Sequence, residues 1–193
     1  PPEIRMGRDE IKAAEEDRLP DLIDTARTLG DARVYTEASG GRFTLEELVD
    51  ACRARGYRWI VVAERSREVA GEKGVSSAQL RERLESIREL NARLDDFRII
   101  SGVEVEISPV GTFDIDLNTL AEVEWVVAGV KKHTEMEAEE MTERIIWGLE
   151  TGVVSCLAHP TGRHLGVHDG YRMYFDEIVE VARDFGVALE MSG

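Results

Sequence analysis

The chain has 193 residues, of which 42% are hydrophobic and 33% are charged, a length and composition that suit one domain with a sizeable core. The formal net charge of -15 argues against a protein that grips nucleic acid over its whole surface, because such binding depends on phosphate neutralisation by Lys and Arg. The sequence has no run of about 18 apolar residues and no basic-then-apolar leader, so we expect a cytoplasmic protein that does not contact membranes.

The first 29 residues are charged and lack apolar periodicity. We interpret residues 1–29 as a linker from a preceding domain, with one or two solvated helical turns. In this interpretation residues 21–27 lie against the domain that follows, which spans residues 30–193.

Strand and helix patterns alternate through that domain. Apolar runs predict strands at residues 31–36, 57–63, 98–107, 125–130, 153–158 and 187–191. Helical spacing predicts helices at residues 45–55, 79–94, 116–121, 137–150 and 175–185. Thr44 and Glu47 form a capping box that opens the first of these helices. Because the connections are short, the alternation predicts parallel strands joined by helices.

Several of the predicted strands end on polar residues. His159 ends an apolar strand that turns at once at Pro160, and Glu64, Glu104 and Lys131 also lie at strand ends. The carboxyl ends of parallel strands in a barrel meet at one rim, where chemistry is usually done. We therefore expect the functional site at this rim.

Five stretches resemble one known family in their order and spacing. They are residues 30–36, 45–47 together with 54–57, 102–105, 139–144 and 158–163. They resemble the polymerase-and-histidinol-phosphatase (PHP) domain, and more narrowly the one found C-terminal in bacterial family X DNA polymerases.

The resemblance implies an α/β fold of the PHP type, a distorted seven-stranded (β/α) barrel that is TIM-like and incomplete at the C-terminus of this chain. It implies two or three metal ions at the strand tips, commonly manganese or zinc, that hydrolyse phosphoesters and remove nucleotides from DNA 3′ ends. It also implies two partners: a polymerase half in the same chain, with its own magnesium for repair synthesis, and DNA bound through the parent protein.

At the rim the sequence departs from the family pattern. The family's His-x-His motif and nearby aspartate fall on Arg33, Tyr35 and Gly40. Its Asp-His pair after the second strand falls on Glu64 and Arg65, and its histidine after the fourth strand falls on Lys131. Glu104 and His159 match the family outright, and Glu64 matches conservatively.

The replacements would bring up to three cations to the place of the metals. Two unit charges about 4 Å apart interact by roughly 4 kcal/mol at an effective dielectric near 20, so cations at this place oppose metal binding. We therefore predict no cofactor and no metal cluster in this domain. Arg33 or Arg65 is expected to pair with Glu104 or Glu64 instead.

Two functions stay open at this point. The first is a catalytically degenerate PHP domain with a structural or regulatory role in a DNA polymerase. The alternative is a metal-dependent 3′-5′ exonuclease or phosphoesterase that uses a reduced ligand set of Glu64, Glu104 and His159 with manganese or zinc. In that alternative His133 could contribute if the loop after the fourth strand were rearranged.

Overall fold

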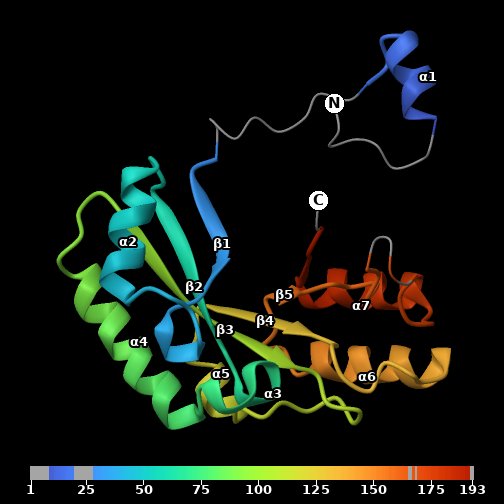
Figure 1. Ribbon diagram of the computed structural model, residues 1–193. Coiled ribbons are helices and arrows are strands. Elements are labelled where there is room, and N and C mark those ends of the chain that lie inside the picture. Colours follow the sequence, from blue (N-terminus) through green and yellow to red (C-terminus); the bar gives the residue numbers. More distant parts are fainter. Residues whose placement is uncertain (1–8, 20–27, 165–166, 168, 192–193) are drawn as a thin grey trace.

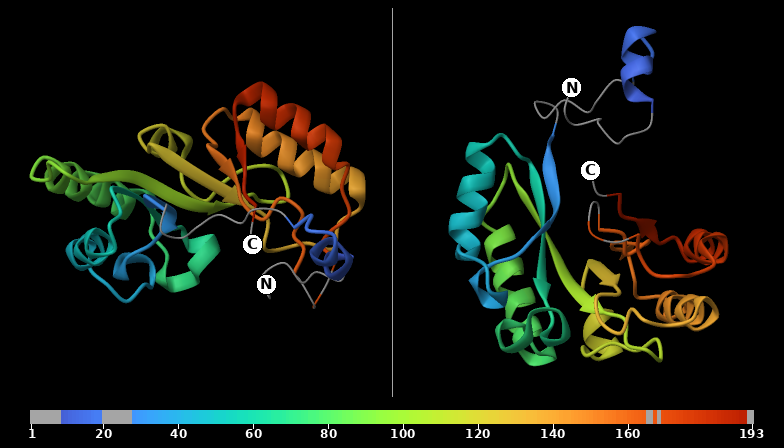
Figure 2. Two further views of the ribbon diagram at one scale, coloured as in Figure 1. Left: turned by 90° about the horizontal axis from the view of Figure 1, so that it is seen from above. Right: turned by 45° about the vertical axis from the view of Figure 1, so that its right-hand side comes forward.

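The sheet is the framework of the molecule. The structure, a computed structural model, describes residues 9–19, 28–164, 167 and 169–191. In this part of the chain six strands form one sheet in sequence order, and all neighbouring pairs are parallel. The strands are β1 (Gly30–Val34), β2 (Trp59–Arg65), β3 (Arg98–Glu106), β4 (Trp125–Gly129), β5 (Cys156–Leu157) and β6 (Ala188–Leu189). Figures 1 and 2 show the sheet curled into a half-barrel, with β1 and β6 as its edges.

Helices cover the outer face of this sheet. Helices α2 (Leu45–Ala54) and α4 (Ser77–Asn91) lie against β1 to β3, and α6 (Ala138–Glu150) and α7 (Phe175–Phe185) lie beside β4 to β6 (Figure 1). Both α2 and α4 open with a capping box, Thr44 with Glu47 and Ser76 with Gln79. The shorter helical segments are α1 (Glu10–Glu15), η3 (Glu37–Ser39), α3 (Arg67–Ala70), η4 (Gly71–Lys73) and α5 (Leu117–Leu120).

The alternation of side chains along β3 separates the core from the site. Val103 and Val105 belong to the larger hydrophobic core, together with residues of α4, α6 and α7. Successive side chains of a strand point to opposite faces, so Glu104 and Glu106 face the concave side of the sheet. The curled sheet thus presents two acidic side chains of β3 on the face that the helices do not cover.

The α/β class and the curled, TIM-like parallel sheet predicted from the sequence are confirmed. Strands β5 and β6 are shorter than predicted, although hydrogen bonds from Ser155 N to Val126 O and from Ala158 N to Ala128 O extend the contact of β5 with β4. Helix α4 ends earlier than predicted, because the side chain of Asn91 bonds the backbone N–H and C=O of Ile99. A seventh strand and the PHP type stay predictions.

The predicted linker is described only in part. Helix α1 lies within it and contains no buried residue, as expected of solvated helical turns. Residues 1–8 and 20–27, which include the whole segment expected to lie against the domain, are outside the described residues. Among the helices of the described chain, none combines the length and apolar character needed to cross a lipid bilayer.

Candidate functional site

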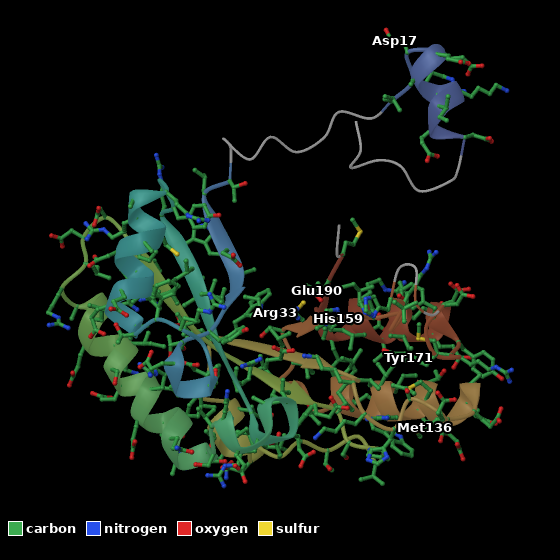
Figure 3. The ribbon with its side chains drawn as sticks, in the orientation of Figure 1. Asp17, Arg33, Met136, His159, Tyr171 and Glu190 are labelled. Atoms are coloured by element: carbon green, nitrogen blue, oxygen red, sulfur yellow. The ribbon has the colours of Figure 1, made fainter. Side chains whose placement is uncertain are left out.

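Five side chains from five strand ends meet on the concave side of the sheet. We call Arg33, Glu104, Lys131, His159 and Glu190 the rim cluster. Arg33 extends from β1 toward His159 and Glu190, which follow β5 and β6 (Figure 3). Its NH2 lies 3.3 Å from His159 Nε2, and its NH1 lies 3.1 Å from Glu190 Oε1. One arginine therefore connects the two edges of the open sheet.

His159 is held in an unusual backbone conformation. Its φ is 46°, in the left-handed region that non-glycine residues rarely adopt. The N–H of His159 donates to Glu190 Oε2 at 3.0 Å, and its carbonyl accepts hydrogen bonds from Gly162 N at 2.8 Å and Tyr171 OH at 3.2 Å. Such strain persists only where surrounding contacts over-determine the conformation, and it is concentrated at functional sites.

The contacts of the His159 ring assign its proton. A guanidinium can only donate hydrogen bonds, so Nε2 must accept from Arg33 and must carry a lone pair. The proton of the neutral ring is then on Nδ1, which lies 3.4 Å from Glu190 Oε2. Glu190 therefore contacts both the backbone N–H and the ring of His159, and fixes the direction in which the ring points.

Glu104 is buried, with 7% of its side chain exposed, and two cations neutralise it. Lys131 Nζ lies 2.5 Å from Glu104 Oε1, and Arg33 NH1 lies 4.0 Å from the same oxygen. The pairing of Arg33 with Glu104 was expected from the sequence, whereas the closer pairing with Lys131 was not.

A second ion pair, which includes a carboxylate on the same face of β3, holds the backbone at Lys131 in position. Glu106 and Arg144, which we call the anchor pair, lie 3.1 Å apart, and the Arg144 side chain is fully buried. Glu106 accepts hydrogen bonds from the backbone N–H groups of Lys131 and Lys132. Arg144 donates to the carbonyls of Ile107 and Lys132. These bonds fix the chain after β4 and thereby direct Lys131 toward Glu104.

Glu64 does not join the rim cluster in the contacts of the described residues. Its carboxylate accepts hydrogen bonds from Thr36 Oγ1 at 2.5 Å and Ser39 Oγ at 2.6 Å, and Arg83 Nε of α4 lies 3.3 Å away. Glu64 shares its strand face with Ile60 and Val62, whose hydrophobic core includes residues of α2 and α4. Glu64 therefore lies between β2 and the helix layer, where it contacts Arg83 of α4.

Arg65, Tyr35 and Gly40 form a neighbouring group. The guanidinium of Arg65 lies 3.9 Å from the centroid of the Tyr35 ring and donates from NH2 to the carbonyl of Ser39 at 2.6 Å. Gly40 has a φ of 87°, in the left-handed region that favours glycine, and a Cβ at this position would lie 3.0 Å from Arg65 NH2. Among the described residues Arg65 forms no ion pair with Glu64 or Glu104, in contrast to the pairing considered for it from the sequence.

A wide cleft of about 1590 Å³ opens beside the rim cluster. Lys131, His159, Glu190, Met136 and Tyr171 line it, together with the segment after His159. Burial raises the pKa of Tyr171 to about 12, so the phenol is neutral when it donates to the His159 carbonyl. The cleft gives solvent and solutes access to the imidazole and to Glu190 beside it.

The residues present do not fit the metal ions that the family resemblance implies. Arg33 occupies the lone pair of His159 Nε2, and Lys131 lies on Glu104. Across the described ranges, no three His, Cys, Asp or Glu side chains gather closely enough to hold a metal ion. His133, considered as a contributor, is exposed, and its carbonyl accepts a hydrogen bond from Arg144 NH1.

Sequence reasoning did not identify four residues that build this site: Glu106, Arg144, Tyr171 and Glu190. Glu190 had a signal, because it follows the last apolar strand in the way that His159 follows the fifth. Glu106 had the period-two relation to Glu104 on the same strand. Arg144 and Tyr171 lie on a helix and in a loop, where no pattern distinguishes them from surface residues.

Comparisons with known proteins extend the description. A curled parallel half-barrel with a polar rim at the carboxyl ends of its strands places the chain among the TIM-like α/β proteins. No family model matches the chain. Over 192 residues, 100% of this chain, it is 32% identical to the DNA polymerase/3'-5' exonuclease PolX of Bacillus subtilis (strain 168). The chain spans 33% of the length of that relative. It is therefore a homologue of PolX, and the predicted relation to bacterial family X DNA polymerases is confirmed.

Proposed function

We propose that the chain is a PHP domain of a DNA polymerase of the PolX family, that it does not hydrolyse phosphoesters, and that its role is structural or regulatory. The rim cluster carries this proposal: the donor atoms of His159 and Glu104 are taken by the cations Arg33 and Lys131. A cation fixed on a lone pair excludes a divalent metal from that position, because the two charges repel.

The rest of the proposal follows from the relationship to PolX. A polymerase half of the same protein would bind DNA and use magnesium for nucleotide transfer in repair synthesis. This domain would then be a cytoplasmic partner of that half and a platform for its orientation. A seventh strand that completes the barrel belongs to the same proposal.

A second candidate function is a metal-dependent 3′-5′ exonuclease, and the name of the relative favours it. Glu104 and His159 are present at the rim, and manganese or zinc would be the metal. This function would require Arg33 and Lys131 to leave their partners, and Glu64 to turn away from Arg83.

An assay of nucleotide release from 3′-labelled DNA in the presence of manganese distinguishes the silent domain from the exonuclease. The matched control is His159→Ala, which removes the imidazole that both candidates place at the rim. We expect equal, background release from the wild-type chain and the variant. Manganese-dependent release that disappears in His159→Ala would overturn the proposal of a silent domain and support the exonuclease.

A further inference from the structure

Helix α6, on the outer face of the sheet, carries an exposed tryptophan (Figure 1). Trp147 is 46% exposed, whereas Met141 and Leu149 of the same helix are fully buried in the larger hydrophobic core. The start of α7 packs on another side of α6, where Tyr174 N donates a hydrogen bond to Thr142 Oγ1. Trp147 follows Thr142 by five residues and lies about 140° further around the helix. Its indole therefore faces away from α7.

The turn after β3 presents a second apolar side chain beside this tryptophan. Ser108 N donates to Thr112 O at 2.8 Å, Gly111 N donates to Ser108 O at 2.9 Å, and Thr112 N donates to Ser108 Oγ at 3.0 Å. Val110, at the tip of the turn, is 67% exposed. Gly111 lies against α6, since a Cβ at this residue would overlap the Cβ of Trp147. Val110 and Trp147 therefore form one apolar surface on a turn that hydrogen bonds hold in place.

Glutamates of α6 border this apolar surface. Glu143 and Glu150 lie four residues before and three residues after Trp147, so they share its side of the helix, and Glu139 lies one turn before Glu143. All three glutamates are exposed, and in the part of the chain that the structure describes none of them forms an ion pair. The single arginine of α6, Arg144, is fully buried and does not compensate their charge at the surface.

The arrangement has the anatomy of a protein interface. An apolar centre with a polar rim is typical of such surfaces, and tryptophan is among the residues that contribute most to binding. A turn that is already fixed reduces the conformational entropy lost on association. We call Val110, Trp147, Glu143 and Glu150 the docking patch.

The charge of the docking patch restricts what can cover it. A second copy of this chain, with its net charge of -15, would bring its own glutamates, and DNA or an anionic lipid surface would bring phosphates. Each of these would repel Glu143 and Glu150. A complementary partner carries cations around an apolar side chain.

We propose that the docking patch binds a basic protein segment, which places an apolar side chain on Trp147 and Val110 and Lys or Arg side chains beside Glu143 and Glu150. The proposal goes beyond the proposed function and does not depend on it, because the docking patch shares no residue with the rim cluster. A domain with a structural or regulatory role acts through contacts of this kind.

The test is titration of the isotope-labelled chain with a synthetic amphipathic helical peptide of Lys and Leu, followed by NMR of the indole N–H groups. We expect the signal of Trp147, assigned by its loss in Trp147→Phe, to shift and saturate. The signals of the half-buried Trp59 and Trp125 should stay in place. The same peptide with Glu in place of Lys should cause no shift, and salt should weaken the binding of the Lys peptide.

Variants at the apolar centre separate this surface from other exposed apolar residues. Trp147→Ala retains the Cβ that Gly111 contacts, and it should weaken binding about tenfold, as measured by fluorescence anisotropy of the labelled peptide. Leu117→Ala is the matched control, because Leu117 is 50% exposed on α5, and its affinity should equal that of the wild type. If Trp147→Ala does not fold, Val110→Ser at the tip of the turn replaces it and should also weaken binding.

Variants at the rim of the docking patch separate it from negative charge in general. Glu143→Gln combined with Glu150→Gln should weaken binding and reduce its dependence on salt. Glu82→Gln combined with Glu89→Gln removes two exposed glutamates at the same spacing on α4, and it should leave the affinity unchanged.

Three results would overturn the proposal. The first is equal affinity of Trp147→Ala and Leu117→Ala, and the second is equal affinity of the two glutamine double variants. The third is a wild-type dimer in sedimentation that Trp147→Ala dissociates, which would assign the docking patch to a second copy. None of these results affects the silent rim, whereas manganese-dependent nucleotide release would overturn the proposed function and leave the docking patch in place.

Discussion

The rim cluster and the anchor pair each contain one carboxylate from the same face of β3, Glu104 and Glu106, but the two groups differ in their exposure to solvent. Glu106 and Arg144 have side chains that are 5% and 0% exposed, and both are surrounded by backbone hydrogen-bonding partners. In the rim cluster, Lys131 and His159 are 40% and 37% exposed and border a cleft. The two carboxylates of β3 therefore have different roles. Glu106 holds the chain after β4 through buried hydrogen bonds, whereas Glu104, two residues earlier, pairs with a lysine that is exposed to solvent.

Removal of the buried cation is expected to have the largest effect. Arg144→Met leaves Glu106 charged and buried, and leaves the carbonyls of Ile107, Lys132 and His133 without their donor. We expect a loss of about 3–5 kcal/mol in the free energy of unfolding, the usual result of breaking one side of a buried pair. Chemical denaturation measures it.

Arg183→Met is the control for this change, because Arg183 pairs with Asp184 on the surface. It should unfold like the wild type. An Arg144→Met variant that matched this control would contradict the description of the anchor pair as the element that fixes the chain after β4.

Removal of a rim cation should cost less. Lys131→Met takes away the closest partner of Glu104 but leaves Arg33 within 4.0 Å of it. We expect a loss of about 1 kcal/mol in the free energy of unfolding, since the lysine is already partly solvated and screened. The neighbouring variant Lys132→Met, which removes an exposed pair with Glu68, is the control and should show no measurable loss. Equal losses in the two variants would mean that the contact of Lys131 with Glu104 does not contribute to the free energy of unfolding.

Tyr171 links the two regions, and its removal should have the smallest effect at neutral pH. Its hydroxyl donates to the carbonyl of His159, and its ring lies near enough to Arg144 and Glu106 to be influenced by their charges. Tyr171→Phe should lower the free energy of unfolding by about 0.5–1 kcal/mol, the net worth of one hydrogen bond.

The pH dependence provides a second measurement on the same residue. Burial raises the pKa of Tyr171 from 10.0 in the unfolded chain to about 12, so the unfolded state loses this proton first as the pH rises. The stabilisation is complete below pH 10 and is lost as the pH rises toward about 12. Denaturation of Tyr171→Phe between these pH values should show a shallower decline than the wild type. If the free energy of unfolding fell equally with pH in the variant and the wild type, the phenol would have the same pKa in the folded and unfolded states.

Most strands and helices could be predicted from the sequence because the patterns that indicate them lie within each element. The apolar runs of β2 and β3 and the capping box at Thr44 each predict their element without knowledge of the rest of the chain. Strands β5 and β6 were predicted too long, because their length depends on how many residues a neighbouring strand can pair with.

Only some residues of the rim cluster could be predicted from the sequence. The strand-end argument identified Lys131 and His159, since the ends of parallel strands converge on one rim, and the family resemblance identified Arg33. It did not show which of the acidic residues would face that rim. Glu64 is directed to Arg83 in the helix layer, whereas Glu190 reaches Arg33, and these choices depend on tertiary contacts that no local pattern encodes.

Calorimetric titration of the purified chain with manganese, with His159→Ala as the control, tests most directly whether tethered cations have replaced metal ions at the rim. Our account predicts no heat of binding at millimolar manganese for either protein, because Arg33 and Lys131 occupy the donor atoms of His159 and Glu104. Tight binding of two or more ions by the wild-type chain, lost in His159→Ala, would contradict it and identify the rim as a working metal centre.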